Sequence, residues 1–535
     1  MKVTLLYKDR EWGTEKSYFD KEEICKDLNL NIIFKTAGSF SDEPEEGKAV
    51  KIAMERDNHV VEMTKRVMLT PLLTQEEVYY RQQMVKEAVE NYGWIKELYQ
   101  AAKEAGEEVA RFTAEKKKRG YGSGTDQGRQ HIANISYLER IVYYLDRVEA
   151  AMRNWKESFV TEEAAAFAGN FLSEYHPEYK ECLKKVVKDI RTSTVDGIME
   201  VAAALGPGLS MTALVLCDIR EPEVIKTGFL RSAAGKIGGF CRSLFEKDTK
   251  SIDGENQNLL QDIGEIKNVT LGAMMHFFEP FLEEKEIFFR QMYLQTAFLM
   301  GAANLYYRVH RVGVDFCFPK VVEQKDMSFE GLVEMSLALY NLRCPVANTL
   351  FAKDKHLVVV TGANQGGKST YLRSIGIAQV MMQCGMYVPA KSFESGLYRN
   401  VFTHFTRRED SAMNSGRLDE ELGRMERIID NLTKDSVLLL NESFATTTEK
   451  EGSLIAEDIT KALYECGVRV MMVTHLMAFA KSCYEKRPEH ALFLSAERQD
   501  DGVRTFRMIE QEPELTSYGL DLYEALINAP AAESE

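Results

Sequence analysis

Apolar residues recur at three- and four-residue spacing through most of the first 320 residues. The repeat is clearest at 85–91, at 135–145 and over the long run 257–312. This spacing is typical of helices with one buried face. The first part of the chain is therefore predicted to be helical.

The pattern changes after about residue 325. Short apolar runs at 357–360, 436–440 and 468–473 alternate there with helical segments. Such alternation predicts a parallel α/β sheet whose ligand lies at the carboxyl ends of the strands. Two further strand-like runs flank Asp500-Asp-Gly502 and predict a hairpin at the edge of that sheet.

These patterns predict a multidomain protein with three consecutive parts. They are an N-terminal element with an acidic linker (1–50), an elongated all-α region (51–324) and an α/β domain (325–535). The helical part is too long for a single bundle layer. Its basic, glycine-rich stretch 115–124 is predicted to be a solvated loop. A nucleic-acid arm, in which Lys116 to Arg119 contact phosphates, is the alternative.

A glycine-rich loop follows the first of these apolar runs. Residues 357–370 read Leu-Val-Val-Val-Thr-Gly-Ala-Asn-Gln-Gly-Gly-Lys-Ser-Thr, and a helical pattern comes next. Glycine lets backbone N–H groups close around an anion. Lys368 is placed to reach the β- and γ-phosphates, and Ser369 to offer its hydroxyl to Mg²⁺. The sequence therefore predicts a P-loop that binds ATP and magnesium.

The run 436–440 ends in Asn441 and Glu442. A carboxylate at this place can polarise the water that attacks the γ-phosphate, so Glu442 is the predicted catalytic base. Aspartate is usual at the position of Asn441, where its charge orients Mg²⁺ through water. Asparagine keeps an oxygen but loses the charge. A second-shell loss of this kind lowers metal affinity or turnover by roughly 10- to 100-fold, which predicts slow hydrolysis.

His475 follows the third apolar run. An imidazole at that strand end can donate a hydrogen bond to the γ-phosphate. The alternative is a structural histidine in a loop. The sequence leaves both interpretations open.

Composition and charge limit the remaining choices. The 535 residues are 45% hydrophobic, and the formal net charge of −15 argues against a surface coated by nucleic acid. Nine cysteines are scattered singly and predict reduced core thiols in a cytoplasmic protein. The start lacks the apolar segment of a signal peptide, and no later run has the roughly 20 apolar residues that cross a bilayer. We therefore expect no membrane partner.

The loop 361–370 resembles the Thr-Gly-Pro-Asn-Met-Gly-Gly-Lys-Ser-Thr loop of MutS-family ATPases. It shares with that loop the second glycine and Asn364, which generic P-loops lack. Further similar segments occur in the same order: Tyr387-Val-Pro-Ala390, Phe402-Thr403, Ser415-Gly-Arg417, Asn441-Glu442 with Thr447 and Gly452, Thr474-His475 and Ser517-Tyr-Gly519. The resemblance covers residues 325–530. Weaker motifs, Leu69-Thr-Pro-Leu72 and Arg81-Gln-Gln83, extend it over 55–320.

The resemblance implies an ABC-like ATPase that forms a homodimer with two composite nucleotide sites. It places the nucleotide at Gly362, Asn364, Gly366, Gly367, Lys368, Ser369, Thr370 and Asn441, with Asn348 on the adenine side. It assigns magnesium to Ser369 and, through water, to Asn441. The partner would complete each site with Ser415, Gly416 and Arg417. Here Leu418-Asp-Glu420 stands where the family usually has Ser-Thr-Phe. One interpretation is that the two carboxylates repel the γ-phosphate bound in the partner. The other is that this segment is the charged start of a surface helix.

The resemblance also implies a clamp on DNA, in mismatch repair or a related transaction. About 50 residues precede the helical region, so we do not expect the family's mismatch-reading and connector domains or their Phe-x-Glu wedge there. A different hypothesis is an ATP-binding switch or scaffold with little hydrolysis and no DNA contact. Asn441, the changed segment and the negative charge favour it. A transporter subunit is disfavoured because the Leu-Ser-Gly-Gly-Gln signature is absent.

Overall fold

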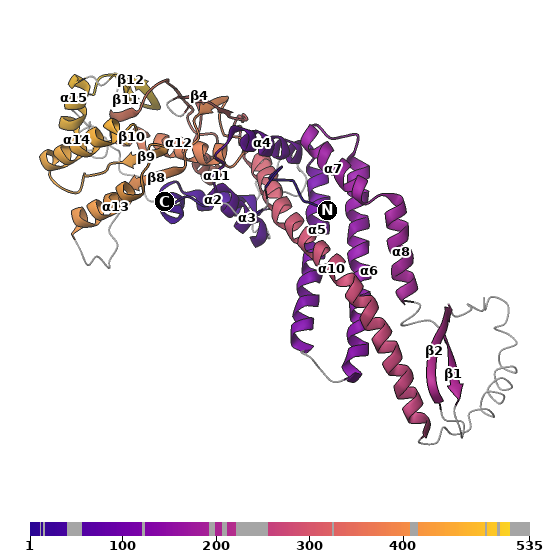
Figure 1. The fold of residues 1–535 in the computed structure, drawn as a ribbon. Helices are drawn as coiled ribbons and strands as arrows, with labels where there is room; N and C mark the ends of the chain where they lie inside the picture. Colours follow the sequence, from indigo (N-terminus) through magenta and orange to yellow (C-terminus); the bar gives the residue numbers. More distant parts are fainter. Residues whose placement is uncertain are drawn as a thin grey trace, which may run out of the picture. The chain divides into compact units, whose positions relative to one another are not determined.

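A six-stranded sheet lies at the centre of the α/β part, with strand order β12-β11-β6-β10-β9-β8 (Figure 1). The five strands from β11 to β8 run parallel, whereas β12 pairs antiparallel with β11 at the edge. Their bounds are β6 (Leu357–Gly362), β8 (Asn400–Phe405), β9 (Ser436–Asn441), β10 (Arg469–Val473), β11 (Ala491–Arg498) and β12 (Arg504–Glu510). The predicted parallel sheet and its antiparallel edge are confirmed.

The computed structural model describes residues 1–10, 12–13, 16–39, 56–119, 124–191, 198–205, 211–220, 255–323, 326–406, 416–486, 489–499 and 503–513. These residues form two compact units that are discontinuous along the chain. The first contains residues 1–3, 97–157 and 167–293, and the second contains 4–96, 158–166 and 294–535. The sequence predicts three consecutive parts instead, and that division stays a prediction.

The first unit is largely helical. Its elements, some of which run on into the second unit, are α5 (Tyr92–Arg119), α6 (Gly124–Trp155), α7 (Glu162–Glu174), α8 (Pro177–Arg191), α10 (Glu255–His310), β1 (Ile198–Leu205) and β2 (Met211–Arg220). Helix α10 matches the predicted run 257–312. On α6, Asp146 accepts hydrogen bonds from Tyr175 Oη at 3.0 Å and pairs with Lys180 Nζ at 3.1 Å. These contacts hold α6 against the chain from the end of α7 into α8.

Two expectations about the helical region are wrong. Strands β1 and β2 form an antiparallel pair, so the region is not all-α. The pair forms because residues 198–220 hold two runs rich in apolar residues that can satisfy each other's backbone groups. The predicted loop 115–124 is also wrong in part, since α5 continues to Arg119 and α6 begins at Gly124. Lysine and arginine are good helix formers, so Lys116 to Arg119 extend the helix rather than end it.

The second unit surrounds its main sheet with helices and a smaller four-stranded sheet of order β3-β7-β4-β5. Its other elements are α1 (Lys21–Asp27), α2 (Leu30–Ala37), α3 (Asn58–Met68), α4 (Gln75–Glu90), α11 (Met335–Asn341), α12 (Lys368–Gln383), α13 (Arg417–Asn431), α14 (Glu449–Glu465), α15 (Met477–Lys486), β3 (Lys320–Val321), β4 (Met327–Leu332), β5 (Asn348–Ala352) and β7 (Ser392–Ser395). Every residue of β6 and β10 is buried. That burial explains why apolar residues follow one another without alternation at 357–360 in β6 and at 470–473 in β10.

The N-terminal segment belongs to the second unit. Helix α1 packs on β8, and α2 packs on α11 and α3. Asp20 caps α1 by accepting from Glu23 N, and the buried Ile24 and Cys25 of α1 face the unit's core. The predicted acidic linker covers residues 39–47, and all of it except Ser39 lies outside the described residues. Residues 4–39 are therefore part of the α/β unit's structure.

The cysteines are only partly core residues. Cys25 and Cys384 are buried, but Cys182, Cys344 and Cys466 are exposed, which contradicts the expectation of core thiols throughout. The scattered spacing of the cysteines argues against a cysteine motif in the sequence, but it does not indicate whether each thiol is buried. Among the described helices, none is long and apolar enough to cross a membrane.

Candidate functional site

A pocket of about 630 Å³ opens at the carboxyl edge of the main sheet. Its walls come from the loop between β6 and α12, the segment between β4 and β5, and the ends of β9, β10 and β12. The predicted site residues among its walls are Asn348, Asn364, Gly366, Gly367, Lys368, Ser369, Thr370, Glu442 and His475. Residues that are far apart in the sequence therefore converge on one cavity.

The glycines of the loop are required by close packing as well as by backbone conformation. Gly362 has φ +106°, and a Cβ there would lie 2.7 Å from the backbone nitrogen of Ala496 on β11. At Gly366 a Cβ would lie 2.9 Å from the carbonyl oxygen of Ala363. Gly367 has φ +89° and begins α12 without a side-chain cap. The first turn of α12 thus presents uncapped N–H groups to the pocket, a favourable setting for an anion.

Lys368 lies buried beneath this loop. Its Nζ donates to the carbonyl oxygens of Gly362 at 2.8 Å and Ala363 at 2.9 Å. Burial lowers the pKa of Lys368 to about 8, against the opposing attraction of Glu442, while Arg504 lowers it further. A cation held at this cost in a pocket is typical of a functional group rather than of a structural one.

Glu442 and His475 lie together at the ends of β9 and β10. His475 Nε2 is 2.9 Å from Glu442 Oε1. This hydrogen bond lowers the pKa of Glu442, although burial acts in the opposite direction. Strand β10 lies between β6 and β9, which explains how His475 reaches the same pocket as Lys368. Sequence analysis places both residues at strand ends but does not pair them.

Glu442 also has a strained backbone. Its φ is +57°, a left-handed conformation that costs a non-glycine residue roughly 1–3 kcal/mol. The backbone N–H of Glu442 donates to Val473 O at 2.8 Å, and the Thr406 hydroxyl donates to its carbonyl at 2.6 Å. These bonds hold the turn that directs the carboxylate into the pocket.

The donor set suits a magnesium ion bound together with phosphates. Asn441 Oδ1 is buried and has no hydrogen-bond partner among the described residues, and Ser369 lies in the pocket wall. In the described part of the chain no three His, Cys, Asp or Glu side chains cluster as a metal site. Mg²⁺ does not need such a cluster, since it is usually held by one or two protein groups, water and substrate phosphates. The residues present therefore fit the ion.

Asn348 holds the wall of the pocket in place. Its amide nitrogen donates to Phe506 O at 3.1 Å, and its oxygen accepts from Met508 N at 2.8 Å. Both ends of the amide are thus bound to β12, and Phe506 is brought into the pocket wall. Direct contact of Asn348 with a nucleotide stays a prediction.

Glu334 and Tyr371 are pocket residues that sequence analysis missed. Glu334 Oε2 caps α11 by accepting from Leu337 N, whereas its Oε1 has no partner among the described residues. Burial raises the pKa of Glu334, although the Leu337 N–H opposes the shift. Tyr371 Oη is also buried without a partner there. The position of Tyr371 directly after the loop was the available signal, and nothing local marks Glu334 as facing the cavity.

The segment predicted to act in the partner's site is only partly described. Ser415 and Ser517–Gly519 lie outside the described residues, as does the side chain of Arg417. Gly416 is the exposed N-cap of α13, and Asp419 and Glu420 lie in its first turn. Carboxylates there complement the helix dipole. This placement matches the alternative of a charged surface-helix start, and repulsion across a dimer stays untested.

The second unit is an α/β fold with a glycine-rich loop at the carboxyl edge of its parallel strands. The family model for MutS domain V matches residues 358–532, and that for the MutS2 N-terminal domain matches residues 74–312. The chain belongs to the MutS family.

Curated relatives agree with this assignment. The DNA mismatch repair protein MutS of Petrotoga mobilis is 25% identical over 330 residues, which are 58% of this chain and 40% of that protein. The MutS proteins of Thermosipho melanesiensis and Thermotoga neapolitana are 29% and 31% identical over 33% of this chain and 22% of their own lengths. The chain thus spans well under half the length of the curated relatives it matches.

Proposed function

We propose that the chain is an ATPase that binds ATP with Mg²⁺ in the pocket between β6, α12 and the ends of β9 and β10. The observation that carries this proposal is the pairing of two features across one cavity. On one side lie the uncapped start of α12 and the buried cation of Lys368. On the other lies the Glu442–His475 pair.

Lys368 would exchange its two carbonyl partners for oxygens of the β- and γ-phosphates. The phosphate charge would then replace the weak dipoles that now hold its ammonium group. Ser369 would hold Mg²⁺ directly and Asn441 through water, and the ion would supply charge neutralisation on the phosphates. The Oδ1 of Asn441, which is buried and has no hydrogen-bond partner in the part of the chain that the structure describes, supports this role.

Glu442 would accept a proton from the attacking water. Its lowered pKa keeps the carboxylate ionised at neutral pH, which is the form that can accept a proton. His475 orients the Glu442 carboxylate through Nε2, and release from Glu442 would free its N–H for the γ-phosphate. Asn441 lacks the charge of the usual aspartate, so we expect slow turnover.

We further propose that ATP closes a homodimer and moves the helical region on DNA, in mismatch repair or a related DNA transaction. The proteins named above are DNA mismatch repair proteins, and both family models match this chain. The segment Ser415 to Arg417 would complete the partner's site. The division into 1–50, 51–324 and 325–535 and a cytoplasmic location belong to the same proposal.

A second candidate is an ATP-binding switch with little hydrolysis and no DNA contact. Asn441 and the net charge of −15 favour it. Steady-state ATP hydrolysis with and without plain, mismatched and branched duplexes separates the two. Stimulation by any DNA supports the clamp, whereas ATP binding without measurable turnover or DNA binding at low salt supports the switch.

Glu442→Gln tests the catalytic assignment. Glutamine keeps the shape and can still contact His475, but it cannot take a proton from water. We expect ATP binding within about twofold of wild type and turnover lower by roughly 10²- to 10⁴-fold. Undiminished hydrolysis by this variant would remove Glu442 as the base.

A further inference from the structure

The loop after Glu442 is held from outside by a carboxylate on α13. Glu421 Oε1 accepts from the backbone N–H of Phe444 at 2.7 Å, and its Oε2 accepts from the Thr446 hydroxyl at 2.5 Å. Glu421 is only 6% exposed. Both oxygens of one buried carboxylate are thus committed to the segment that immediately follows the predicted base.

This segment needs such a restraint because of its backbone. Glu442 and Phe444 both have left-handed φ values, +57° and +66°, which residues other than glycine rarely adopt. Phe444 is fully buried and stacks on His404, with ring centroids 5.9 Å apart. Strained conformations persist where surrounding contacts over-determine them. Glu421 supplies two of those contacts.

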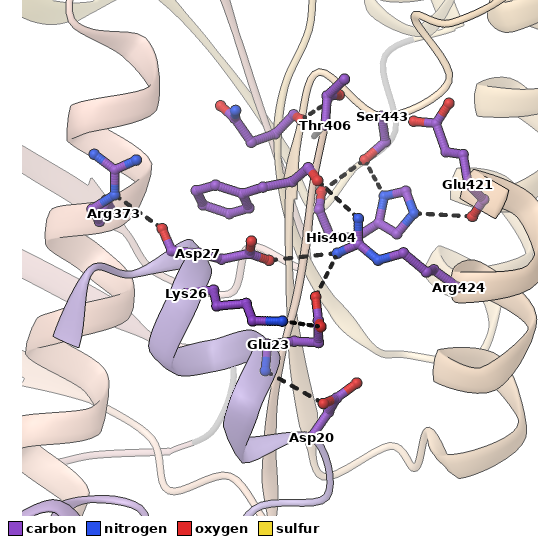
Figure 2. A network of polar contacts seen from close by, with 12 residues as sticks. Asp20, Glu23, Lys26, Asp27, Arg373, His404, Thr406, Glu421, Arg424 and Ser443 are labelled. Carbon is purple, nitrogen blue, oxygen red and sulfur yellow. Dashed lines mark hydrogen bonds and ion pairs between the residues drawn. The ribbon is translucent and has the colours of Figure 1, made fainter. Parts of the chain in front are cut away.

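The residue between them is also tied to α13. Ser443 Oγ lies 2.6 Å from His404 Nδ1, and His404 Nε2 lies 3.1 Å from the carbonyl oxygen of Glu421 (Figure 2). Strand β8, which carries His404, therefore connects the same turn of α13 to the loop by a second route. A shift of α13 along β8 would reach the loop through both.

Helix α13 is in turn anchored by the N-terminal helix α1. Arg424, one turn beyond Glu421, donates to Phe405 O at 2.9 Å and pairs with Glu23 at 3.3 Å and Asp27 at 3.7 Å. Arg424 is 7% exposed, so this contact is buried. Figure 2 shows α1 facing α13 across β8, with Arg373 of α12 donating to the carbonyl of Asp27 at 3.0 Å. One network therefore joins α1, α12 and α13 to the loop.

We propose that Glu421 is a positioning residue for Glu442, and that the ion pairs between Arg424 and α1 fix the helix from which it acts. The inference rests on the proposed ATPase function. Glu421 does not touch the nucleotide pocket. It sets the conformation of the loop that aims the base at water, so it governs turnover rather than ATP affinity.

Glu421→Ala is the first test, with Glu426→Ala as the matched control. Glu426 is exposed on the same helix. We expect the Glu421 variant to lose roughly 10- to 100-fold in kcat, because a displaced base costs about this much, while its Kd for ATP stays within twofold. The control should retain wild-type kcat. Equal kcat in the two variants, or a parallel loss of ATP affinity, would overturn the proposal.

Glu421→Gln separates positioning from folding. Its amide oxygen can still accept from Phe444 N–H and its nitrogen can donate to the Thr446 hydroxyl, so most of the turnover should return. Arg424→Met should lower kcat as Glu421→Ala does, because it releases α13 from α1. A glutamine variant as slow as the alanine variant would contradict the hydrogen-bonding role.

Amide hydrogen exchange keeps this test independent of hydrolysis. Exchange of peptides covering 442–448 should accelerate at least tenfold in Glu421→Ala and stay unchanged in Glu426→Ala. If the wild type binds ATP without turnover, the proposed hydrolysis fails. Hydrogen exchange still tests whether Glu421 holds the loop that carries Glu442. Unchanged exchange in Glu421→Ala would refute it.

Discussion

Replacement of Lys368 by methionine should abolish ATP binding without weakening the fold. Methionine keeps the length of the side chain and removes its charge. Burial lowers the pKa of Lys368 from 10.5 to about 8. At 1.36 kcal/mol per unit, the folded protein carries a cost of about 3 kcal/mol for the charged form. Loss of the two hydrogen bonds to Gly362 and Ala363 removes about 1.5 kcal/mol of stabilisation each, because their donor is charged. The two effects are of similar size, so the variant should be about as stable as the wild type at pH 7.

The pH dependence gives the sign of the effect. Between pH 8 and 10.5 the unfolded chain still holds the proton that the folded chain has released. The wild type therefore gains up to about 1.36 kcal/mol of unfolding free energy per pH unit in this window relative to the variant. Below pH 8 the cost of the buried charge is fully present. Above pH 8 the wild type should therefore become the more stable of the two.

Urea unfolding followed by circular dichroism at pH 7 and pH 9.5 measures this difference. Lys450→Met, at an exposed position on α14, is the matched control and should show no change between the two pH values. A Lys368→Met variant that is destabilised by several kcal/mol, equally at pH 7 and pH 9.5, would show that burial of this charge costs the folded protein nothing. Retention of wild-type ATP affinity would contradict the role of Lys368 in ATP binding.

Two further substitutions test the loop and the metal site. Asn441→Asp restores a charge next to the magnesium position and should raise Mg²⁺ affinity or turnover roughly 10- to 100-fold. A magnesium titration of ATP hydrolysis measures this change. An unchanged titration would contradict the role assigned to Asn441. Gly362→Ala forces a Cβ to 2.7 Å from Ala496 N at φ +106° and should destabilise the protein by about 1–3 kcal/mol in thermal melts. Gly423→Ala, in open space within α13, is its control and should be neutral or stabilising. Equal melting of the two alanine variants would count against the packing argument.

The sequence predicts the parallel strands well because their burial is visible in it. The runs 357–360, 436–440 and 468–473 became β6, β9 and β10 with small changes in bounds. Long amphipathic helices such as α10 were equally clear. In each of these segments, local composition and the final environment agree.

Other features depend on contacts between distant residues. The four-stranded sheet pairs β7 with β3 and β4, across more than 60 residues of sequence. Asn348 finds its partners on β12, and Arg424 finds its own on α1. No local pattern in the sequence predicts such pairs. The sequence does not predict the antiparallel β1–β2 pair, because short apolar runs do not distinguish strand from helix by periodicity alone.

The proposed function depends on ATP binding in the pocket through the loop around Lys368. Isothermal titration of the purified full-length chain with ATP and Mg²⁺ measures this most directly. We expect saturable binding of one ATP per chain, and we expect Lys368→Met to eliminate it. A folded wild-type protein that takes up no ATP, or a variant that binds it equally well, would contradict the proposed function.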